Sequence, residues 1–275
     1  LGCSLPVLDL AGSHSVLANQ PTAFLEGRMT KMKSEILGLG LFGTVVLSGC
    51  FLTGETKNSS EPNATVATES STAEATSPEP QNWGVVYEND FSSYALGEEP
   101  EDLFILDGVF SVREVEGTKV LALPGVPIGD FGILFGPRLK GKPVDLRCRV
   151  FSTRKGRRMP AFVAGLGGLN GFRLRIDCAA GSLRLIRGEE ILTETPFAWK
   201  SGSWTHLRFR VEPTGGEGAK VFGKVWDAAD KEPSTWNLVH RTKELFAGGK
   251  CVLWGIPYAS SEIFFDDLKV FSLAP

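Results

Sequence analysis

The chain has 275 residues, of which 42% are hydrophobic and 22% are charged, and its formal net charge is −3 at pH 7. This length is sufficient for a sizeable hydrophobic core. The near-neutral charge excludes any global electrostatic argument for a nucleic-acid partner, and we expect none.

Residues 1–28 show no coherent pattern, so we expect a mis-assigned start or an unstructured extension rather than a domain. The next segment, 29–49, places Lys31 and Lys33 ahead of an apolar run at 36–47. This run is too short for a membrane-spanning helix, which needs about 20 residues. A short apolar run behind positive charges is typical of a secretory signal peptide.

The apolar run is followed by the letters LSGC, which end at Cys50. This arrangement resembles the lipobox of bacterial lipoproteins, in which the cysteine is lipidated and the preceding peptide is removed. The resemblance implies a membrane anchor through acyl chains on Cys50, because two or more chains hold a protein stably. It also implies a location in the bacterial cell envelope, on the periplasmic or cell-surface side.

Residues 50–82 are rich in Ser, Thr, Pro and Glu, and the stretch 51–82 has five Glu and one Lys. Such a composition cannot bury enough apolar surface to offset the entropy of ordering. Its excess of negative charge favours extension. We therefore expect a disordered acidic tether ahead of a single domain at 83–275.

Twelve short segments of residues 83–275 alternate apolar and polar residues and are separated by Gly, Pro, Asn and Asp. This spacing predicts an all-β fold of two packed antiparallel sheets, a sandwich or jelly roll. The segments are 84–90, 108–114, 119–125, 132–139, 144–152, 161–167, 172–178, 182–188, 205–212, 220–227, 251–257 and 263–272.

Three stretches carry a family resemblance: YENDFSSYALGEEPEDLFILDGVFSV (87–112), WTHLRFRVEPTGGEGAKVFGKVWD (204–227) and IFFDDLKVFS (263–272). Their order resembles the concanavalin A-like lectin/glucanase superfamily, the laminin-G-like jelly rolls. Secreted bacterial domains of unknown function and 3-keto-disaccharide hydrolase domains are particularly similar. The resemblance implies the jelly-roll fold, and fold alone does not specify activity.

Catalytic motifs of this superfamily do not match. Laminarinase-type glycosidases carry E-x-D-x-x-E on one strand, and the similar Glu88-Asn89-Asp90 lacks the third acid. Residues 83–275 contain two histidines, His206 and His240, and no G-x-S-x-G elbow. We name no catalytic residue, although a hydrolase of the 3-keto-disaccharide type stays an alternative.

Arginines recur at alternate positions of three predicted strands, opposite the apolar face. If these strands share one sheet, the stripe indicates a surface that binds an acidic polysaccharide, because arginine pairs bidentately with carboxylate and sulfate. The alternative is a solvated face whose arginines pair with Glu189, Glu190, Glu212 or Asp177. The residues of the stripe are Arg147, Arg149, Arg173, Arg175, Arg208 and Arg210, with Arg184 of the same parity.

Exposed tryptophans would support carbohydrate binding, because sugars stack on aromatic faces. Trp199 and Trp236 lie in turn-like contexts, so they are the candidates for exposure, and packing under a loop is the alternative. Trp204, Trp226 and Trp254 lie in or beside predicted strands, and we expect them in the core.

Some relatives on this fold hold a structural calcium ion between the first and last strands. Asp90, Asp266 and Asp267 are the candidate ligands here, because Ca²⁺ prefers oxygen donors. An ordinary strand-edge turn is the alternative, since neighbouring strand residues point to opposite sides. Cys148, Cys178 and Cys251 lie in apolar strand contexts, which favours buried thiols over a disulfide.

Together these patterns predict a lipid-anchored, exported bacterial protein with a non-catalytic carbohydrate-binding or surface-interaction domain. The alternatives are the hydrolase named above and a structural envelope protein.

Overall fold

The computed structural model describes residues 82–215, 218–258 and 261–273. Within these ranges the chain forms fifteen β-strands and no α-helix. The predicted signal segment 29–49, Cys50 and nearly all of the predicted tether lie outside the described residues. In the described part, no helix has the length and apolar character needed to cross a bilayer.

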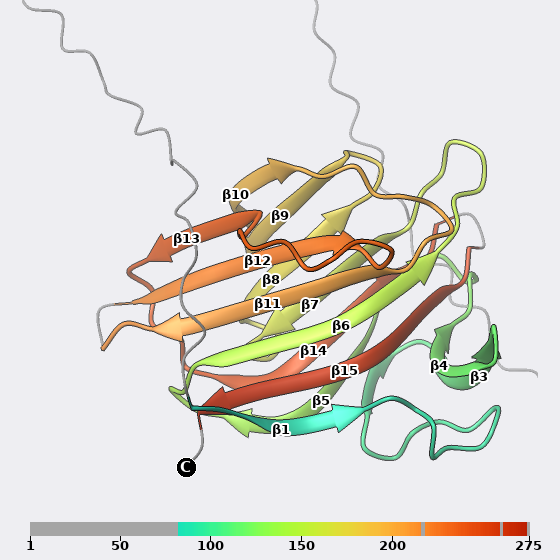
Figure 1. Ribbon diagram of the computed structural model, residues 1–275, viewed down its shortest axis with the longest axis horizontal. Coiled ribbons are helices and arrows are strands. Elements are labelled where there is room, and N and C mark those ends of the chain that lie inside the picture. The colour runs from blue at the N-terminus through green and yellow to red at the C-terminus, as the bar shows by residue number, and fades with distance from the viewer. Residues whose placement is uncertain (1–81, 216–217, 259–260, 274–275) are drawn as a thin grey trace, which may run out of the picture. The chain divides into compact units, whose positions relative to one another are not determined.

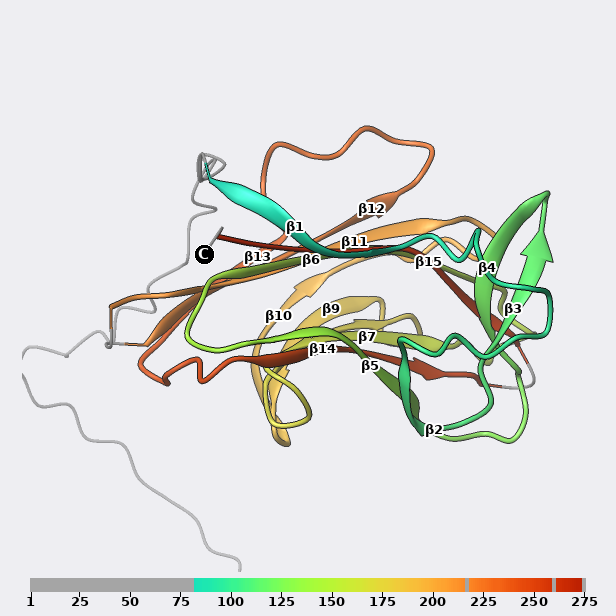
Figure 2. The same ribbon diagram turned by 90° about the horizontal axis from the view of Figure 1, so that it is seen from below.

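The strands form two antiparallel sheets that pack face to face (Figures 1 and 2). Sheet A runs in the order β13 (Leu238–Thr242), β12 (Ala219–Asp227), β11 (Thr205–Pro213), β6 (Val144–Ser152), β15 (Ile263–Leu273), β4 (Thr118–Leu123), β3 (Ser111–Val115), with β1 (Trp83–Asn89) also paired to β15. Sheet B runs in the order β10 (Glu190–Pro196), β9 (Ser182–Arg187), β8 (Phe172–Asp177), β7 (Ala161–Leu166), β14 (Gly249–Ile256), β5 (Phe131–Leu139), β2 (Phe104–Asp107). The predicted two-sheet antiparallel sandwich is confirmed.

Alternating side chains fill the space between the sheets. In β6, Leu146, Cys148 and Val150 are buried in the core, whereas Arg147 and Arg149 point away from it. The same parity holds in most strands of both sheets, and it leaves each sheet with an outer face that carries the polar side chains. The large apolar side chains at the centre of the core include Phe91, Phe110, Phe135, Phe162, Phe209 and Phe265.

β15 changes parity in its middle. Ile263 and Phe265 point into the core, and after the register shift between Asp266 and Lys269 the inward residues are Leu268 and Val270. Asp267 adopts φ 52°, the left-handed conformation typical of a bulge. The bulge therefore turns two consecutive carboxylates toward the outer side of sheet A.

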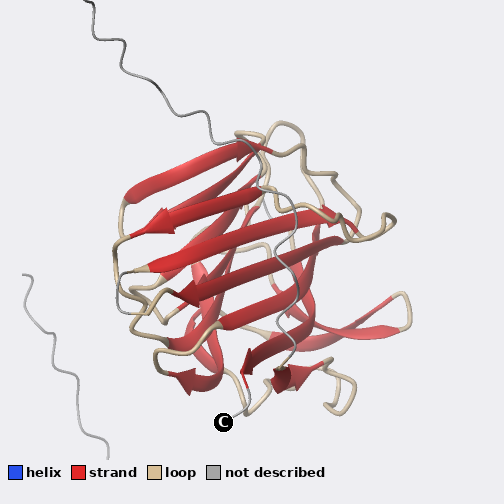
Figure 3. Cartoon of the chain, turned by 60° about the vertical axis from the view of Figure 1, so that its left-hand side comes forward, coloured by secondary structure: helices blue, strands red, loops and turns tan. Residues whose placement is uncertain are grey.

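All twelve predicted segments overlap strands, and three further strands were not predicted. These are β2, β10 and β13, which lie at sheet edges. Strands joined by loops make up the described part of the chain (Figure 3). Few residues of the three edge strands are fully buried: none in β2 or β10, and only Leu238 in β13. An edge strand buries little apolar surface, so its sequence carries a weak alternation.

Candidate functional site

The predicted arginine stripe divides between the two sheets. β6 pairs with β11 in sheet A, where Arg147 lies directly opposite Arg208. β8 pairs with β7 and β9 in sheet B, where Arg175 lies directly opposite Arg184. The outer faces of the two sheets point away from each other across the core. The hypothesis of one continuous arginine surface is therefore wrong.

The arginines of sheet A are held by buried carboxylates. Arg208 donates from Nε and Nη2 to Asp145 Oδ2 at 2.9 and 2.8 Å, and Arg210 donates from Nε to the same oxygen at 2.8 Å. Asp145 and Arg210 are each 1% exposed. Arg147 Nε lies 3.3 Å from Asp145 Oδ1, and Arg210 Nη1 lies 3.4 Å from Glu212, one of the predicted partners. These contacts match the alternative of a paired, structural face.

The loop between β12 and β13 covers this face (Figure 2). Its Glu232 pairs with Arg208 at 2.7 Å and with Lys224 at 2.8 Å. Trp236, from the same loop, lies 5.1 and 5.2 Å from the guanidinium carbons of Arg208 and Arg210. Trp236 is only 8% exposed, which matches the alternative of packing under a loop and not that of an exposed ring. The indole therefore covers the guanidinium groups of Arg208 and Arg210.

Asp266 and Asp267, predicted to bind calcium, bind an arginine. Arg149 Nη2 lies 2.5 Å from Asp266 Oδ2, and Arg149 Nε lies 3.0 Å from Asp267 Oδ2. The alternation argument that separated these carboxylates fails because of the bulge in β15. The Arg149 guanidinium also lies 4.6 Å from the ring of Trp204, which is outside the core although we expected it inside.

Asp90, the third predicted calcium ligand, caps a turn. Its Oδ1 accepts hydrogen bonds from Ser92 N at 3.0 Å and from Ser92 Oγ at 2.7 Å. These bonds lower the pKa of the Asp90 carboxyl. In the described ranges, no group of three or more His, Cys, Asp or Glu side chains is placed to hold a metal ion. A structural calcium therefore has no support from these residues.

The three cysteines of the domain are free and buried. Cys148 on β6 and Cys251 on β14 belong to opposite sheets, and Cys178 follows β8. Burial raises the pKa of the Cys148 thiol to about 12 and also raises the pKa values of the other two thiols. Thiols in this state are poor nucleophiles, because reaction requires the thiolate.

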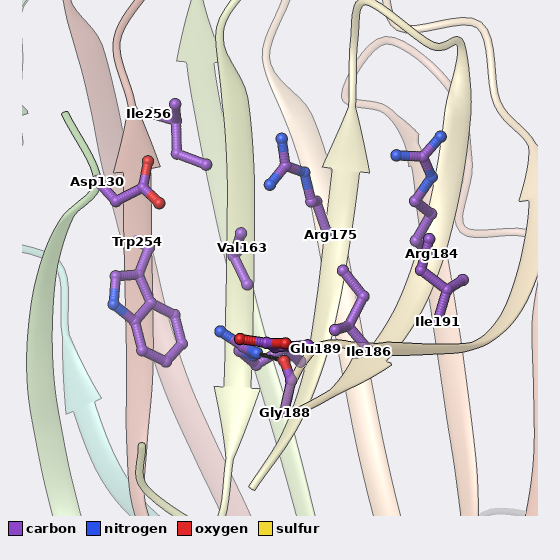
Figure 4. A pocket seen from close by; sticks show the side chains of 11 residues that line it. Asp130, Val163, Arg175, Arg184, Ile186, Gly188, Glu189, Ile191, Trp254 and Ile256 are labelled. Carbon is purple, nitrogen blue, oxygen red and sulfur yellow. Dashed lines mark hydrogen bonds between the residues drawn. The ribbon is translucent and has the colours of Figure 1, made fainter. Parts of the chain in front are cut away.

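The outer face of sheet B presents a different surface, with Trp254 of β14 at its centre. A Cβ built on Gly132 of β5 would meet Trp254 Cδ1 at 2.5 Å, and one built on Gly165 of β7 would meet Cζ3 at 2.9 Å. The two glycines flank β14, so the indole lies flat along the sheet and is partly exposed (Figure 4). The prediction of a core tryptophan is wrong here. The alternation that buries Cys251 and Leu253 and puts Trp254 on the other face was the available signal.

Trp199, the other tryptophan predicted to be exposed, is partly buried. Its ring packs at 5.8 Å from Phe162 and belongs to the margin of the core. Its Nε1 is buried and has no hydrogen-bond partner in the described structure. Trp199 therefore matches the alternative of packing under a loop.

Beside Trp254 lies a pocket of about 380 Å³ (Figure 4). Strands β14, β7, β8 and β9 contribute its floor in that order, and the turn at Gly188 and Glu189 closes one side. The lining residues are Asp130, Val163, Arg173, Arg175, Arg184, Ile186, Gly188, Glu189, Ile191, Trp254 and Ile256.

Arg173 differs from the arginines of sheet A in its partners. It donates from Nη2 to the carbonyl oxygen of Gly188, and its guanidinium carbon lies 6.0 Å from the Trp254 ring centre. Its Nε is buried and has no hydrogen-bond partner, and no carboxylate of the described residues forms an ion pair with it. Arg173 therefore has no carboxylate counter-charge among the described residues, and an anionic ligand would supply one.

Arg175 and Arg184 stand opposite each other, an arrangement that destabilises a sheet unless an anion lies between them. Asp177 supplies this anion, with Oδ2 at 3.4 Å from Arg175 Nε and 2.9 Å from Arg184 Nη1. Arg184 also pairs with Glu194 at 2.9 Å. The Nε of Arg175 makes no hydrogen bond in this arrangement.

The pocket offers recognition groups and few groups for acid–base chemistry. Apart from its three arginines, its titratable side chains are Asp130 and Glu189, and both residues are exposed. Its lining contains no His, Cys, Ser, Lys or Tyr. An aromatic platform beside guanidinium donors is suited to binding a sugar that carries an anionic group.

Comparisons with models of protein families and with curated proteins found no match. Among solved structures, the chain is similar to the carbohydrate recognition domain of Emp46p, with 12% identity and a TM-score of 0.48 over 68% of this chain and 97% of that chain. It is similar to the PL-14 alginate lyase from Aplysia kurodai, with 12% identity and a TM-score of 0.47 over 70% and 100%. It is also similar to the exoplasmic/lumenal domain of VIP36 in a Ca²⁺/Man3GlcNAc-bound form, with 9% identity and a TM-score of 0.44 over 63% and 84%. At these identities and TM-scores, the likenesses carry no argument about what this chain binds.

Proposed function

We propose that residues 83–275 form a non-catalytic carbohydrate-binding domain whose site is the pocket on the outer face of sheet B. The observation that supports this most strongly is the flat, partly exposed indole of Trp254 beside Arg173. A flat ring backed by two glycines presents one face to a sugar, and the sheet holds that face in place before the ligand arrives.

The ligand class that we propose is an acidic polysaccharide, with uronate or sulfate groups. Arg173 and Arg175 both line the pocket, and no carboxylate of the described residues forms an ion pair with Arg173. An anionic ligand group supplies the counter-charge that Arg173 lacks, and hydrogen bonds to charged groups contribute about 1.5–3 kcal/mol each. A neutral sugar offers weaker acceptors to the same groups.

The experiment is a binding titration of the full chain against a polyuronate, a sulfated glycan and a neutral glucan. We expect measurable affinity for the first two and little for the third. Arg173→Ala and Trp254→Ala are each expected to lower the affinity by about tenfold or more, the equivalent of about 1.4 kcal/mol. Arg138→Ala removes an exposed arginine that does not line the pocket, so it serves as the control.

Equal weak binding to all three polymers would contradict the proposal, as would an equal loss in Arg138→Ala and Arg173→Ala. The second result would mean that any surface charge attracts the polymer. Thermal unfolding of each variant identifies losses that come from misfolding.

The hydrolase alternative and the structural alternative need different arrangements of charged side chains. The hydrolase alternative needs two converging carboxylates, and the acids that line the pocket are exposed residues on separate loops. A structural role would use a face of mutually paired charges, and the outer face of sheet A is such a face. The structural role therefore fits sheet A, and binding fits sheet B.

We also propose that the chain is exported and anchored through lipid on Cys50, as the lipobox-like sequence indicates. Mass spectrometry of material purified from a bacterial host membrane is expected to show a new N-terminus at Cys50 with added acyl mass. Cys50→Ser is expected to release the protein from the membrane fraction. An unmodified chain that retains residues 29–49 would contradict the anchor and leave the binding proposal untouched.

A further inference from the structure

A second pocket adjoins the first along the outer face of sheet B. It has a volume of about 350 Å³ and shares Arg175 and Ile256 with the pocket beside Trp254. Its lining residues are Arg157, Arg158, Met159, Pro160, Ala161, Arg175, Asp177, Ala179, Ile256 and Tyr258. Because the two pockets share two lining residues, they are neighbours, and we call the pair the groove, with Arg175 between its two ends.

The far end of the groove is built by the turn at Lys155–Arg158. Lys155 and Arg158 exchange two backbone hydrogen bonds of 3.2 Å, and Gly156 between them has φ 63°, the left-handed conformation that glycine adopts most easily. This turn holds Arg157 and Arg158 at the rim. Both side chains are exposed, and no carboxylate of the described residues pairs with them.

Tyr258 supplies an aromatic ring at this end of the groove, as Trp254 does at the other. Its side chain is 44% exposed and lines the pocket together with Met159 and Pro160. Each end of the groove therefore combines an aromatic ring with arginines that have no carboxylate partner, Arg173 at one end and Arg157 and Arg158 at the other.

The groove is lined by more positively charged than negatively charged side chains. Five arginines line the two pockets, against three carboxylates, and Asp177 is already engaged by Arg175 and Arg184. The excess of positive charge extends over the whole groove instead of ending at one point. A ligand with a single anionic group would use one end only.

We propose that this groove binds several consecutive units of a linear polyanionic glycan, with one anion subsite at Arg173 and a second at Arg157 and Arg158. This inference rests on the proposed function and adds to it a polymeric ligand that is recognised along its chain. The two subsites act as linked binding sites, so engaging the second strengthens binding without any change at the first.

The test is a series of oligogalacturonates of increasing length, from the disaccharide to the dodecasaccharide, titrated against the full chain by calorimetry. We expect affinity to rise by about tenfold or more between the shortest and the longest oligomers and then to level off. In the Arg157→Ala/Arg158→Ala variant, this rise with length is expected to disappear, while binding of the disaccharide persists at the Arg173 subsite.

Arg154→Ala is the matched control, because Arg154 precedes the same turn, is exposed and does not line the groove. It is expected to keep the full rise with length. The comparison separates a second subsite from general attraction of a polyanion to a basic loop, and from the statistical gain of a longer ligand with more binding registers.

The outcomes separate the two proposals. Binding of the disaccharide with no gain from length, or a gain that survives in Arg157→Ala/Arg158→Ala, would overturn the extended groove and leave the pocket beside Trp254 intact. An equal loss in the Arg154→Ala control would also overturn it. No binding at any length, together with no binding to sulfated glycans, would overturn both.

Discussion

The orientation of Trp254 depends on residues that have no side chain. Gly132 and Gly165 lie under the indole from the strands on either side of β14. Any side chain at either position would occupy the volume of the ring, so the ring would have to lift from the sheet. The stacking surface is therefore made by three strands, although a single residue presents it.

Gly165→Ala tests this support directly. The new Cβ would lie 2.9 Å from Trp254 Cζ3, so we expect the indole to tilt and the affinity for acidic glycans to fall several-fold. The backbone at Gly165 is an ordinary strand, so the fold should persist. Gly84→Ala is the control, because a Cβ there has no heavy atom within 4 Å. Unchanged glycan affinity in Gly165→Ala would show that the flat ring is not needed.

The buried ion pairs of sheet A predict that Asp145 contributes strongly to the stability of the fold. This carboxylate accepts hydrogen bonds from Arg208 and Arg210, and all three residues are buried. Asp145→Asn leaves buried guanidiniums without their counter-charge, and removing one partner of a buried pair costs about 3–5 kcal/mol. Urea denaturation should show a loss of this size.

An exposed ion pair provides the comparison. Arg113 and Glu262 pair at 2.6 Å with side chains 48% and 43% exposed. Glu262→Gln is expected to cost at most about 1 kcal/mol, because solvent screens such pairs. Equal losses of unfolding free energy in Asp145→Asn and Glu262→Gln would show that burial does not determine how much the ion pairs of sheet A contribute to stability.

For single residues, the sequence predicts on which side of a strand a side chain lies better than it predicts how exposed that side chain is. Alternation correctly put Arg147, Arg149, Arg173 and Arg175 outside the core. It does not predict which outer face a loop covers, so the sequence leaves open whether Trp236 is exposed or packed under a loop, and the ring is buried. Exposure of an outward residue depends on loops that are distant in sequence, and local patterns do not contain that information.

Secondary-structure elements were predicted where they bury one face. β6, β8 and β11 show a clear alternation because their apolar sides pack into the core. The bulge in β15 was missed, since the left-handed conformation of Asp267 has no glycine to mark it. The sheet to which each strand belongs was also not predictable, and this is why the arginine stripe was placed on one face.

Two histidines of sheet A, His206 on β11 and His240 on β13, make a prediction about pH. Burial, followed by the nearby charge of Arg149, lowers the pKa of His206, which also stacks on Trp226. Burial lowers the pKa of His240 on β13, against the opposing charges of Glu190 and Glu244. Both imidazoles are therefore more easily protonated in the unfolded chain, where the pKa is about 6.5.

A lowered pKa in the folded state means that the unfolded state binds more protons below about pH 6.5. The free energy of unfolding should therefore decrease as the pH falls from about 7.5 through 6.5 and below, until the folded histidines also become protonated. Denaturation curves at several pH values measure this slope. The His206→Gln/His240→Gln variant should show a flatter slope, and a slope equal to that of the unmodified chain would contradict the assignment.

On the scale of the whole domain, β15 holds sheet A together. It pairs with β6 along one side, and with β4 and then β1 along the other. Its partners come from residues as distant in sequence as Trp83, which pairs with Leu273. Such long-range pairing makes folding slow compared with a helical domain, because distant segments must meet before they gain contacts.

A chain that stops before Ile263 tests this role. It would lack the inward Phe265, Leu268 and Val270, which are all 0% exposed, and would leave the neighbouring strands without partners. We expect loss of the cooperative unfolding transition and of glycan binding, although the pocket residues on sheet B remain in the chain. A truncated chain with a cooperative transition would show that sheet A closes without β15.

The late position of this central strand also constrains how the polypeptide is handled during its synthesis. While the ribosome is still making the residues after Tyr258, the earlier strands of sheet A lack the neighbour that joins them. Sheet A therefore stays open until β15 has been made. On the export route that we propose, this strand order would keep sheet A open, and the chain able to pass through a secretion channel, until β15 has been made.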